Sequence, residues 1–230
     1  KVTVIDSMNA SVGQGLVAMY AAECAQAGYD AARVIEAARA IRPKTRTFGL
    51  VGSLEYAVRG GRVPRWVKNV ADRLQLMPIL HNDRKGRVTA GGVLFGRNHL
   101  REKFARFIRR RMRDDCTYRI LVGHANCEAD GRWLLERLSG ANLAWGRLLP
   151  LGSALGVHGG PGMLVVALPE HDRPRAAHDQ RVARFVRLDH RDDRHPGHAH
   201  HRADQLAQLG RVGVRQIKRL DDLVVVLRVL

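Results

Sequence analysis

A glycine-rich segment of seven residues carries the side chain best placed to do chemistry in this chain of 230 residues. Gly156–Gly162 reads Gly-Val-His-Gly-Gly-Pro-Gly, so a single imidazole, that of His158, stands among glycines and a proline. Glycine allows positive φ and a close approach of the backbone to a ligand, and proline favours a tight turn. Backbone N–H groups in such a loop, here those of Gly159, Gly160 and Gly162, can converge on an anion. The segment predicts a small anion or carboxylate site, with a histidine that merely caps a backbone carbonyl as the alternative.

The elements around this loop follow an α/β pattern. The apolar run Met163–Leu168, directly after it, predicts a buried strand. At the start of the chain we expect a strand, two helices and a second strand, at Val2–Ile5, Leu16–Ala27, Asp30–Ile41 and Phe48–Val51. Strand, glycine turn, helices and strand in this order indicate a parallel α/β unit. We therefore predict a first lobe with a parallel sheet over residues 1–74.

The chain changes its pattern near residues 74–78 and again after Glu170. Helices are predicted at Leu54–Arg59, capped by Ser53, and at Val63–Leu74. Beyond them, short strands and helices alternate at Met77–Leu80, Val88–Phe95, His99–Met112, Tyr118–Val122 and Glu128–Leu138. We predict a second α/β lobe over residues 75–170. Residues 171–230 are rich in histidine and arginine, and their middle part is too polar to pack, so a disordered tail is expected there.

Composition limits the classes of function. A formal charge of +17 favours contact with phosphates, and the basic helix at residues 99–113 makes nucleic-acid binding one alternative. Aromatic residues are only 5% of the chain, too few for a base-stacking surface, so no specific nucleic acid is expected. The three cysteines lack metal-ligand or redox spacing, which favours a reduced, cytoplasmic setting with no metal or cofactor. No apolar run reaches the roughly 18–20 residues that span a bilayer.

An enzyme is the other alternative, a hydrolase or transferase with His158 as its general base. The pair Asp6 and Ser7, at the end of a predicted strand, keeps this alternative open. However, no serine or cysteine nucleophile motif accompanies the histidine, and the carboxylates show no pairing on a helix face that suits acid–base chemistry. The residues therefore favour a binding protein over a catalyst.

Five sequence motifs, taken in order, resemble those of the DegV family. They are Val4-Ile5-Asp6-Ser7 with Gly13 and Gly15; Leu54-Glu55-Tyr56 with Gly60-Gly61-Arg62 and Met77-Pro78-Ile79-Leu80; the basic segment Arg97–Ala105; His124-Ala125-Asn126; and His158-Gly159-Gly160-Pro161-Gly162. Each motif alone is short, but their common order and sensible spacing make the resemblance specific. It covers residues 2–170.

Similarity to this family implies a two-lobed α/β protein that holds a long-chain fatty acid between its lobes. Members serve as lipid-binding subunits of a bacterial fatty-acid kinase. They present the carboxylate, as fatty acid or acyl phosphate, to a separate kinase protein and are not themselves the phosphotransferase. The resemblance implies that His158 and either Arg97 or Arg101 meet the carboxylate. An arginine–carboxylate pair is charge-assisted and can be bidentate.

The chain departs from the family pattern at both ends. The family has a segment before the residue that matches Val2, which supplies the first strands and hydroxyl groups that contact the carboxylate. The first lobe and the cleft are therefore expected to be incomplete here. The family pattern also ends soon after the strand that follows its Gly-Pro-Gly, so residues 171–230 have no counterpart.

Overall fold

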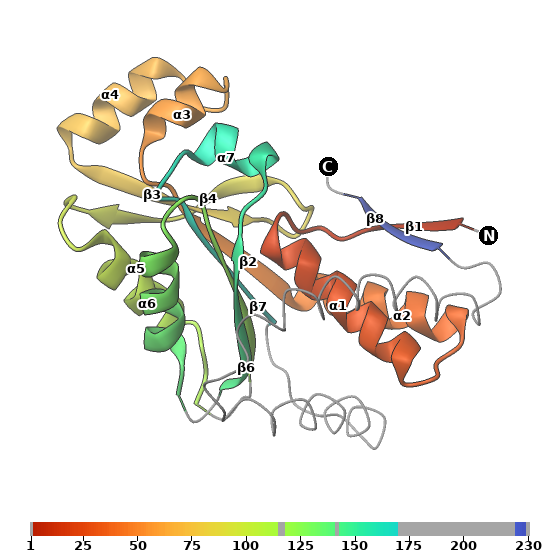
Figure 1. The fold of residues 1–230 in the computed structure, drawn as a ribbon. Coiled ribbons are helices and arrows are strands. Elements are labelled where there is room, and N and C mark those ends of the chain that lie inside the picture. The colour runs from red at the N-terminus through yellow and green to blue at the C-terminus, as the bar shows by residue number, and fades with distance from the viewer. Residues whose placement is uncertain (1, 115–117, 141–142, 170–223, 229–230) are drawn as a thin grey trace.

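Two β-sheets and their covering helices make up the computed structural model, which describes residues 2–114, 118–140, 143–169 and 224–228 (Figure 1). The smaller sheet pairs β1 (Val2–Asp6) in parallel with β8 (Val224–Arg228). The larger sheet has six strands in the order β4-β3-β2-β7-β5-β6. These are β2 (Thr45–Leu50), β3 (Leu76–Asn82), β4 (Val88–Phe95), β5 (Tyr118–His124), β6 (Leu143–Pro150) and β7 (Leu164–Pro169). The α/β class predicted from the sequence is confirmed.

Strand β2 has different neighbours from those that the sequence predicted. We expected residues 48–51 to join residues 2–5 in a parallel sheet, but β2 lies between β3 and β7 and is antiparallel to both. Its last four residues are all buried, as is the whole of β7, and strands covered on both faces belong in the centre of a sheet. That prediction is wrong. The larger sheet therefore extends across the boundary expected at residue 74.

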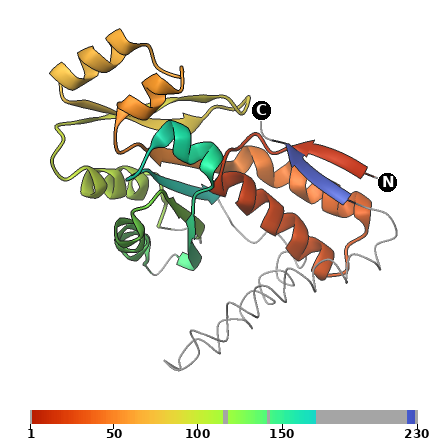
Figure 2. The same ribbon diagram turned by 45° about the horizontal axis from the view of Figure 1, so that its top comes forward.

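Helices cover both faces of the larger sheet (Figure 2). Besides α1 (Val12–Gln26) and α2 (Ala31–Ile41), the described residues form α3 (Leu54–Arg59), α4 (Arg65–Arg73), α5 (Leu100–Arg109), α6 (Glu128–Leu138), α7 (Ser153–Gly159) and a short 3-10 helix, Arg42–Lys44. Helices α5 and α6 pack on one face and α1 on the other (Figure 1). The apolar face predicted for α5 is confirmed, because Phe104 and Ile108 are fully buried and Leu100 and Phe107 pack against the same core.

Helix α1 contributes to two clusters of buried apolar side chains. Val12 and Leu16 pack in the core of the larger sheet, whereas Val17 and Cys24 belong to a second cluster with Ile5 of β1 and with residues of α2. A helix that is covered on more than one side needs apolar residues around most of its circumference. This explains the alanine-rich, apolar sequence of α1.

Local capping signals are also confirmed. The Asp30 carboxylate accepts a hydrogen bond from the Arg33 backbone N–H at 2.9 Å and caps α2. The Ser53 hydroxyl accepts one from the Glu55 backbone N–H at 3.1 Å and caps α3. Both residues satisfy a backbone donor that the first helical turn leaves without an intrahelical partner.

Most of the predicted tail, residues 171–230, lies outside the described residues. The exception is β8, whose backbone pairs with β1 in the register Val2↔Val224 to Asp6↔Arg228. Within the described part of the chain, no helix is both long and apolar enough to cross a membrane.

Candidate functional site

Two of the sequence motifs meet where α7 packs against α3. The sequence predicted a loop over Gly156–Gly162, but residues 156–159 form the end of α7, and His158 lies in its last turn. The loop prediction is wrong there because the tight turn comes later, at Gly160 and Gly162, whose φ angles are 71° and 83°. The ring of Tyr56 on α3 occupies the space beside Gly160: a Cβ added there would lie 2.2 Å from Tyr56 Cδ2.

The imidazole of His158 lies against the end of α3. A Cβ added to Gly60 would be only 2.2 Å from His158 Nδ1, so the absence of a side chain at Gly60 lets the ring approach the backbone. Nδ1 is buried and has no hydrogen-bond partner among the described residues. Leaving a buried polar atom unpaired costs about 1–3 kcal/mol. This nitrogen is therefore enclosed where α7 packs against the end of α3.

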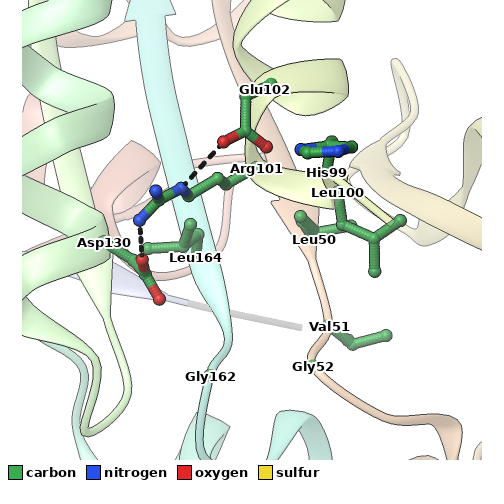
Figure 3. A pocket seen from close by; sticks show the side chains of 10 residues that line it. All are labelled: Leu50, Val51, Gly52, His99, Leu100, Arg101, Glu102, Asp130, Gly162 and Leu164. Atoms are coloured by element: carbon green, nitrogen blue, oxygen red, sulfur yellow. Dashed lines mark hydrogen bonds and ion pairs between the residues drawn. The ribbon is translucent and has the colours of Figure 1, made fainter. Parts of the chain in front are cut away.

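A pocket of about 320 Å³ lies at the ends of β2 and β7 (Figure 3). Its volume falls at the lower end of the roughly 300–1,000 Å³ typical of small-molecule pockets. Apolar and charged side chains share its wall, which is formed by Leu50, Val51, Gly52, His99, Leu100, Arg101, Glu102, Asp130, Gly162 and Leu164. The basic segment and the glycine motif predicted from the sequence thus meet at the same pocket: the first contributes His99, Leu100, Arg101 and Glu102, and the second contributes Gly162.

Two carboxylates hold Arg101 at this wall (Figure 3). Arg101 Nη1 donates a hydrogen bond to Asp130 Oδ1 at 2.6 Å, and Nε donates one to Glu102 Oε1 at 3.1 Å. The guanidinium also stacks near the ring of Trp133, with Cζ 4.7 Å from the ring centroid. The hydrogen bonds to Asp130 and Glu102 raise the pKa of Arg101. A planar group fixed in this way is pre-organised for a further hydrogen bond.

Glu102 presents a second oxygen to the pocket. Hydrogen bonds from its own backbone N–H and from Arg101 lower the pKa of this carboxyl, so it is ionised at neutral pH. Its Oε2 is buried without a hydrogen-bond partner among the described residues and lies on the side of His99 (Figure 3). The charges of Glu102 and Asp130 therefore offset that of Arg101 at this wall.

The sequence prediction missed several of the lining residues. Glu102 and His99 lie inside the segment that was described only as basic. Asp130 follows Arg101 by 29 residues and reaches it only because α5 packs against α6. Leu50 and Val51, which form the apolar wall, were predicted only as the end of a strand. Of these residues, only Glu102, an acidic residue within the basic segment, could have been noticed in the local sequence.

His158 is not one of the lining residues, and neither is Arg97, the other arginine that the sequence left open. It forms an ion pair with Asp72 of α4. Lys68 pairs with the same carboxylate at 2.7 Å. Arg97 thus ties the segment before α5 to α4. The remaining predicted residue, Gly159, packs against Met163, whose sulfur would be 2.0 Å from an added Cβ.

Removing the Asp72 charge should have a small, pH-dependent effect. The hydrogen bond from Lys68, and next the charge of Lys68 and of Arg97, lower the Asp72 pKa below its ordinary value of 3.8. A lowered pKa means that ionised Asp72 stabilises the fold at neutral pH and that this contribution is lost as the pH falls through the lowered pKa. We expect Asp72→Asn to reduce the free energy of unfolding at neutral pH by only about 0.5–1 kcal/mol, because solvent screens the pair.

Denaturant titrations at neutral and strongly acidic pH measure this difference. The control is Asp30→Asn, since asparagine caps a helix as well as aspartate does. An Asp72→Asn loss that is equally large in acid would mean that the side chain acts through packing rather than charge.

The features behind the two alternative functions have structural roles. Ser7 is fully buried and its hydroxyl donates to the Asn9 carbonyl at 2.9 Å, so it presents no exposed nucleophile. Arginines of the basic helix are engaged within the chain: besides Arg101, Arg111 stacks on the Phe107 ring, with Cζ 3.4 Å from its centroid, and Arg109 reaches the Leu138 carbonyl. In the described ranges, no three His, Cys, Asp or Glu residues gather as metal ligands.

The fold and the pocket define a mixed α/β protein with an arginine-bearing, partly apolar pocket at its strand ends. The chain belongs to the DegV family, whose profile, described as an uncharacterised protein of the DegV family, matches residues 1–170. This match confirms the resemblance that the five motifs indicated.

Relatives and solved structures agree with this assignment. A DegV domain-containing protein of Clostridium perfringens is 34% identical over 170 residues, covering 73% of this chain and 60% of the relative. A structure from Thermus thermophilus that describes fatty-acid binding of a DegV family protein is 26% identical, with a TM-score of 0.63 over 74% of this chain and 61% of its own. Bacillus subtilis DegV, described as a fatty-acid-binding protein, shares the fold at 23% identity and a TM-score of 0.59, over 72% and 59% of the two chains. The chain spans about three fifths of the length of the relatives it matches.

Proposed function

We propose that this chain binds a long-chain fatty acid, with the carboxylate at Arg101 and the acyl chain along the apolar wall. The observation that carries the proposal is that Arg101 and its neighbours in the basic segment line one pocket of about 320 Å³ together with Gly162, the last residue of the His-Gly-Gly-Pro-Gly motif. Family membership supports it, as does the fatty-acid binding described for the Thermus thermophilus relative.

The apolar wall and the unoccupied donor of Arg101 suit an amphipathic ligand with a carboxylate head, while Glu102 and Asp130 oppose its charge. Leu50, Leu100 and Leu164 offer apolar surface, and each CH₂ group buried there contributes about 0.8 kcal/mol. Arginine has five N–H donors, and Arg101 Nη2 makes no hydrogen bond among the described residues. A ligand carboxylate can therefore bond Arg101 without displacing Asp130 or Glu102. His158 Nδ1 is the second polar contact that we propose, and Gly159, Gly160 and Gly162 shape the turn beside it.

Substitution of Arg101 should separate binding of the charged head from binding of the acyl chain. A charge-assisted hydrogen bond contributes roughly 1.5–3 kcal/mol, so Arg101→Ala should bind a fatty acid about tenfold to hundredfold more weakly. A fatty alcohol of equal length should bind nearly as well to the variant as to the parent, because the apolar wall is unchanged. His158→Ala should show the same pattern. Titration of both ligands against each protein measures the effect.

Arg97→Ala is the matched control, because Arg97 lies on the same segment but pairs with Asp72. It should leave both affinities nearly unchanged. Equal losses for the acid and the alcohol in Arg101→Ala would mean that Arg101 only shapes the pocket. Failure of the parent chain to bind any long-chain fatty acid would rule out the proposal.

We further propose a carrier role, in which the bound carboxylate is presented to a separate fatty-acid kinase protein that forms the acyl phosphate. Family membership supports this role, and Ser7, the hydroxyl that kept the enzyme alternative open, is buried and hydrogen-bonded to the Asn9 carbonyl. We propose that the chain itself is not an enzyme. Formation of acyl phosphate from ATP and fatty acid by this chain alone would contradict that statement.

A further inference from the structure

The charged end of the pocket holds more acid than base. Arg101 donates to Asp130 from Nη1 and to Glu102 from Nε, and all three residues line the pocket (Figure 3). Two carboxylates bonded to one guanidinium leave one net negative charge on this group of side chains. His99, the remaining titratable residue of the lining, adds a positive charge only when it is protonated. We call Glu102 and Asp130 the acidic pair.

The acidic pair lies close to the position at which a ligand head bonds. A head bonded to Arg101 Nη2 shares one guanidinium group with both carboxylates, so about two hydrogen-bond lengths separate it from each of them. The side chains of Arg101, Glu102 and Asp130 are 43%, 34% and 44% exposed. Charges that are partly buried are screened less by solvent and salt than fully exposed ones. The acidic pair therefore acts directly on the charge of the head.

The charge of the head decides how strongly this wall opposes it. Coulomb energy is proportional to the charge of the ligand, so a second negative charge doubles both the attraction to Arg101 and the repulsion by the acidic pair. The balance moves against the ligand, because the wall carries more negative than positive charge. The donors of Arg101 that remain for a ligand are the same for either head, so hydrogen bonding does not grow in proportion.

We propose that Glu102 and Asp130 are specificity-determining residues, which admit a singly charged carboxylate and disfavour a dianionic head such as a phosphate monoester. This inference rests on the fatty-acid binding proposed above and adds a charge limit to it. In the carrier role, phosphate transfer raises the charge of the head from one to two. The acidic pair then favours release of the phosphorylated product over its retention.

Three ligands with the same 14-carbon chain test the charge limit. Tetradecanol is neutral, tetradecanoate carries one negative charge, and tetradecyl phosphate is mostly dianionic at pH 8, because the second pKa of a phosphate monoester is about 6. Calorimetric titration of the full chain at pH 8 gives the three dissociation constants. The parent should bind tetradecanoate at least about tenfold more tightly than tetradecyl phosphate.

Asp130→Asn removes one charge and keeps an oxygen that can accept from Arg101. It should raise the affinity for tetradecanoate about threefold to tenfold, because one of the two repulsive charges is gone. The gain for tetradecyl phosphate should be the square of that factor, roughly tenfold to hundredfold, and tetradecanol should bind as it does to the parent. Glu102→Gln should produce the same graded pattern.

Glu128→Gln is the matched control. Glu128 lies on α6 like Asp130 and pairs with an arginine, Arg132, but it is not one of the lining residues. Its substitution changes the net charge of the chain equally and should change each affinity by less than about twofold. Equal gains in Glu128→Gln and Asp130→Asn would overturn the inference, because the effect would then come from the charge of the whole chain.

Two further results would contradict the inference. Weaker binding of both anions to Asp130→Asn would mean that the acidic pair serves only to hold Arg101 in place. Gains that do not increase with ligand charge, or a parent that binds tetradecyl phosphate as tightly as tetradecanoate, would show that the pair sets no charge limit. A parent that binds neither tetradecanoate nor tetradecanol would instead contradict the proposed function itself, and this inference with it.

Discussion

Gly160→Ala is expected to lower the free energy of unfolding by about 2–6 kcal/mol, because two separate costs fall on one methyl group. Gly160 has φ 71° and ψ 174°, a backbone conformation that is essentially restricted to glycine and costs other residues about 1–3 kcal/mol. The new Cβ would also lie 2.2 Å from Tyr56 Cδ2, and relieving such a clash costs typically 1–3 kcal/mol. Equilibrium denaturation of the variant and the parent measures the sum.

Gly61→Ala is the matched control for this prediction. Gly61 also has a positive φ, 68°, but an added Cβ there meets nothing within 4 Å, so only backbone strain remains. Adding Tyr56→Ala to Gly160→Ala should relieve the clash but leave the backbone strain at residue 160. The double-mutant cycle isolates the coupling free energy between the two residues. If Gly61→Ala were as destabilising as Gly160→Ala, the clash with Tyr56 would contribute nothing to the loss of stability. The Tyr56 ring would then be able to move aside at no cost. The close α3–α7 contact would then not hold His158 in place.

Phe104→Ala is expected to destabilise the protein by about 3–5 kcal/mol. Phe104 is 0% exposed and lies in the core beneath α5, with its ring 6.5 Å from that of Phe107. Truncation removes the transfer free energy of the ring and leaves a cavity, since the sheet and α6 limit how far the surroundings can close. Loss of this side chain should also loosen the start of α5, which carries Arg101 and Glu102.

Phe95→Ala is the control, because it makes the same truncation of a phenylalanine at an exposed position. Phe95 is 72% exposed, and surface truncations usually change stability by less than about 0.5 kcal/mol. Urea titrations of both variants therefore separate burial from residue type. Similar losses in the two variants would show that Phe95 is covered in solution, whereas a loss well under 2 kcal/mol in Phe104→Ala would show that the core repacks around the cavity.

Local patterns in the sequence determined the α/β class and most of the elements. The apolar spacing of Phe104 and Ile108 predicted the buried face of α5, and the polar side chains of Asp30 and Ser53 predicted where two helices begin. These features depend on residues a few positions apart, and the 3.6-residue period and the capping hydrogen bonds act over that range. The order and spacing of the five motifs likewise indicated the family without any tertiary information.

The tertiary structure decided which faces and segments meet. Strand β2 joined β3 and β7 because its buried residues needed cover on both faces, and no local pattern says which strands supply it. Arg101 lies at the pocket because α5 packs beside α6 and brings Asp130 to it, whereas Arg97, four residues earlier, is drawn to Asp72 of α4. The periodicity of α4 predicted a helix, but only the packed chain shows that Trp66 and Leu74 stay exposed. Periodicity specifies an apolar face; the long-range packing of the whole chain decides what covers it.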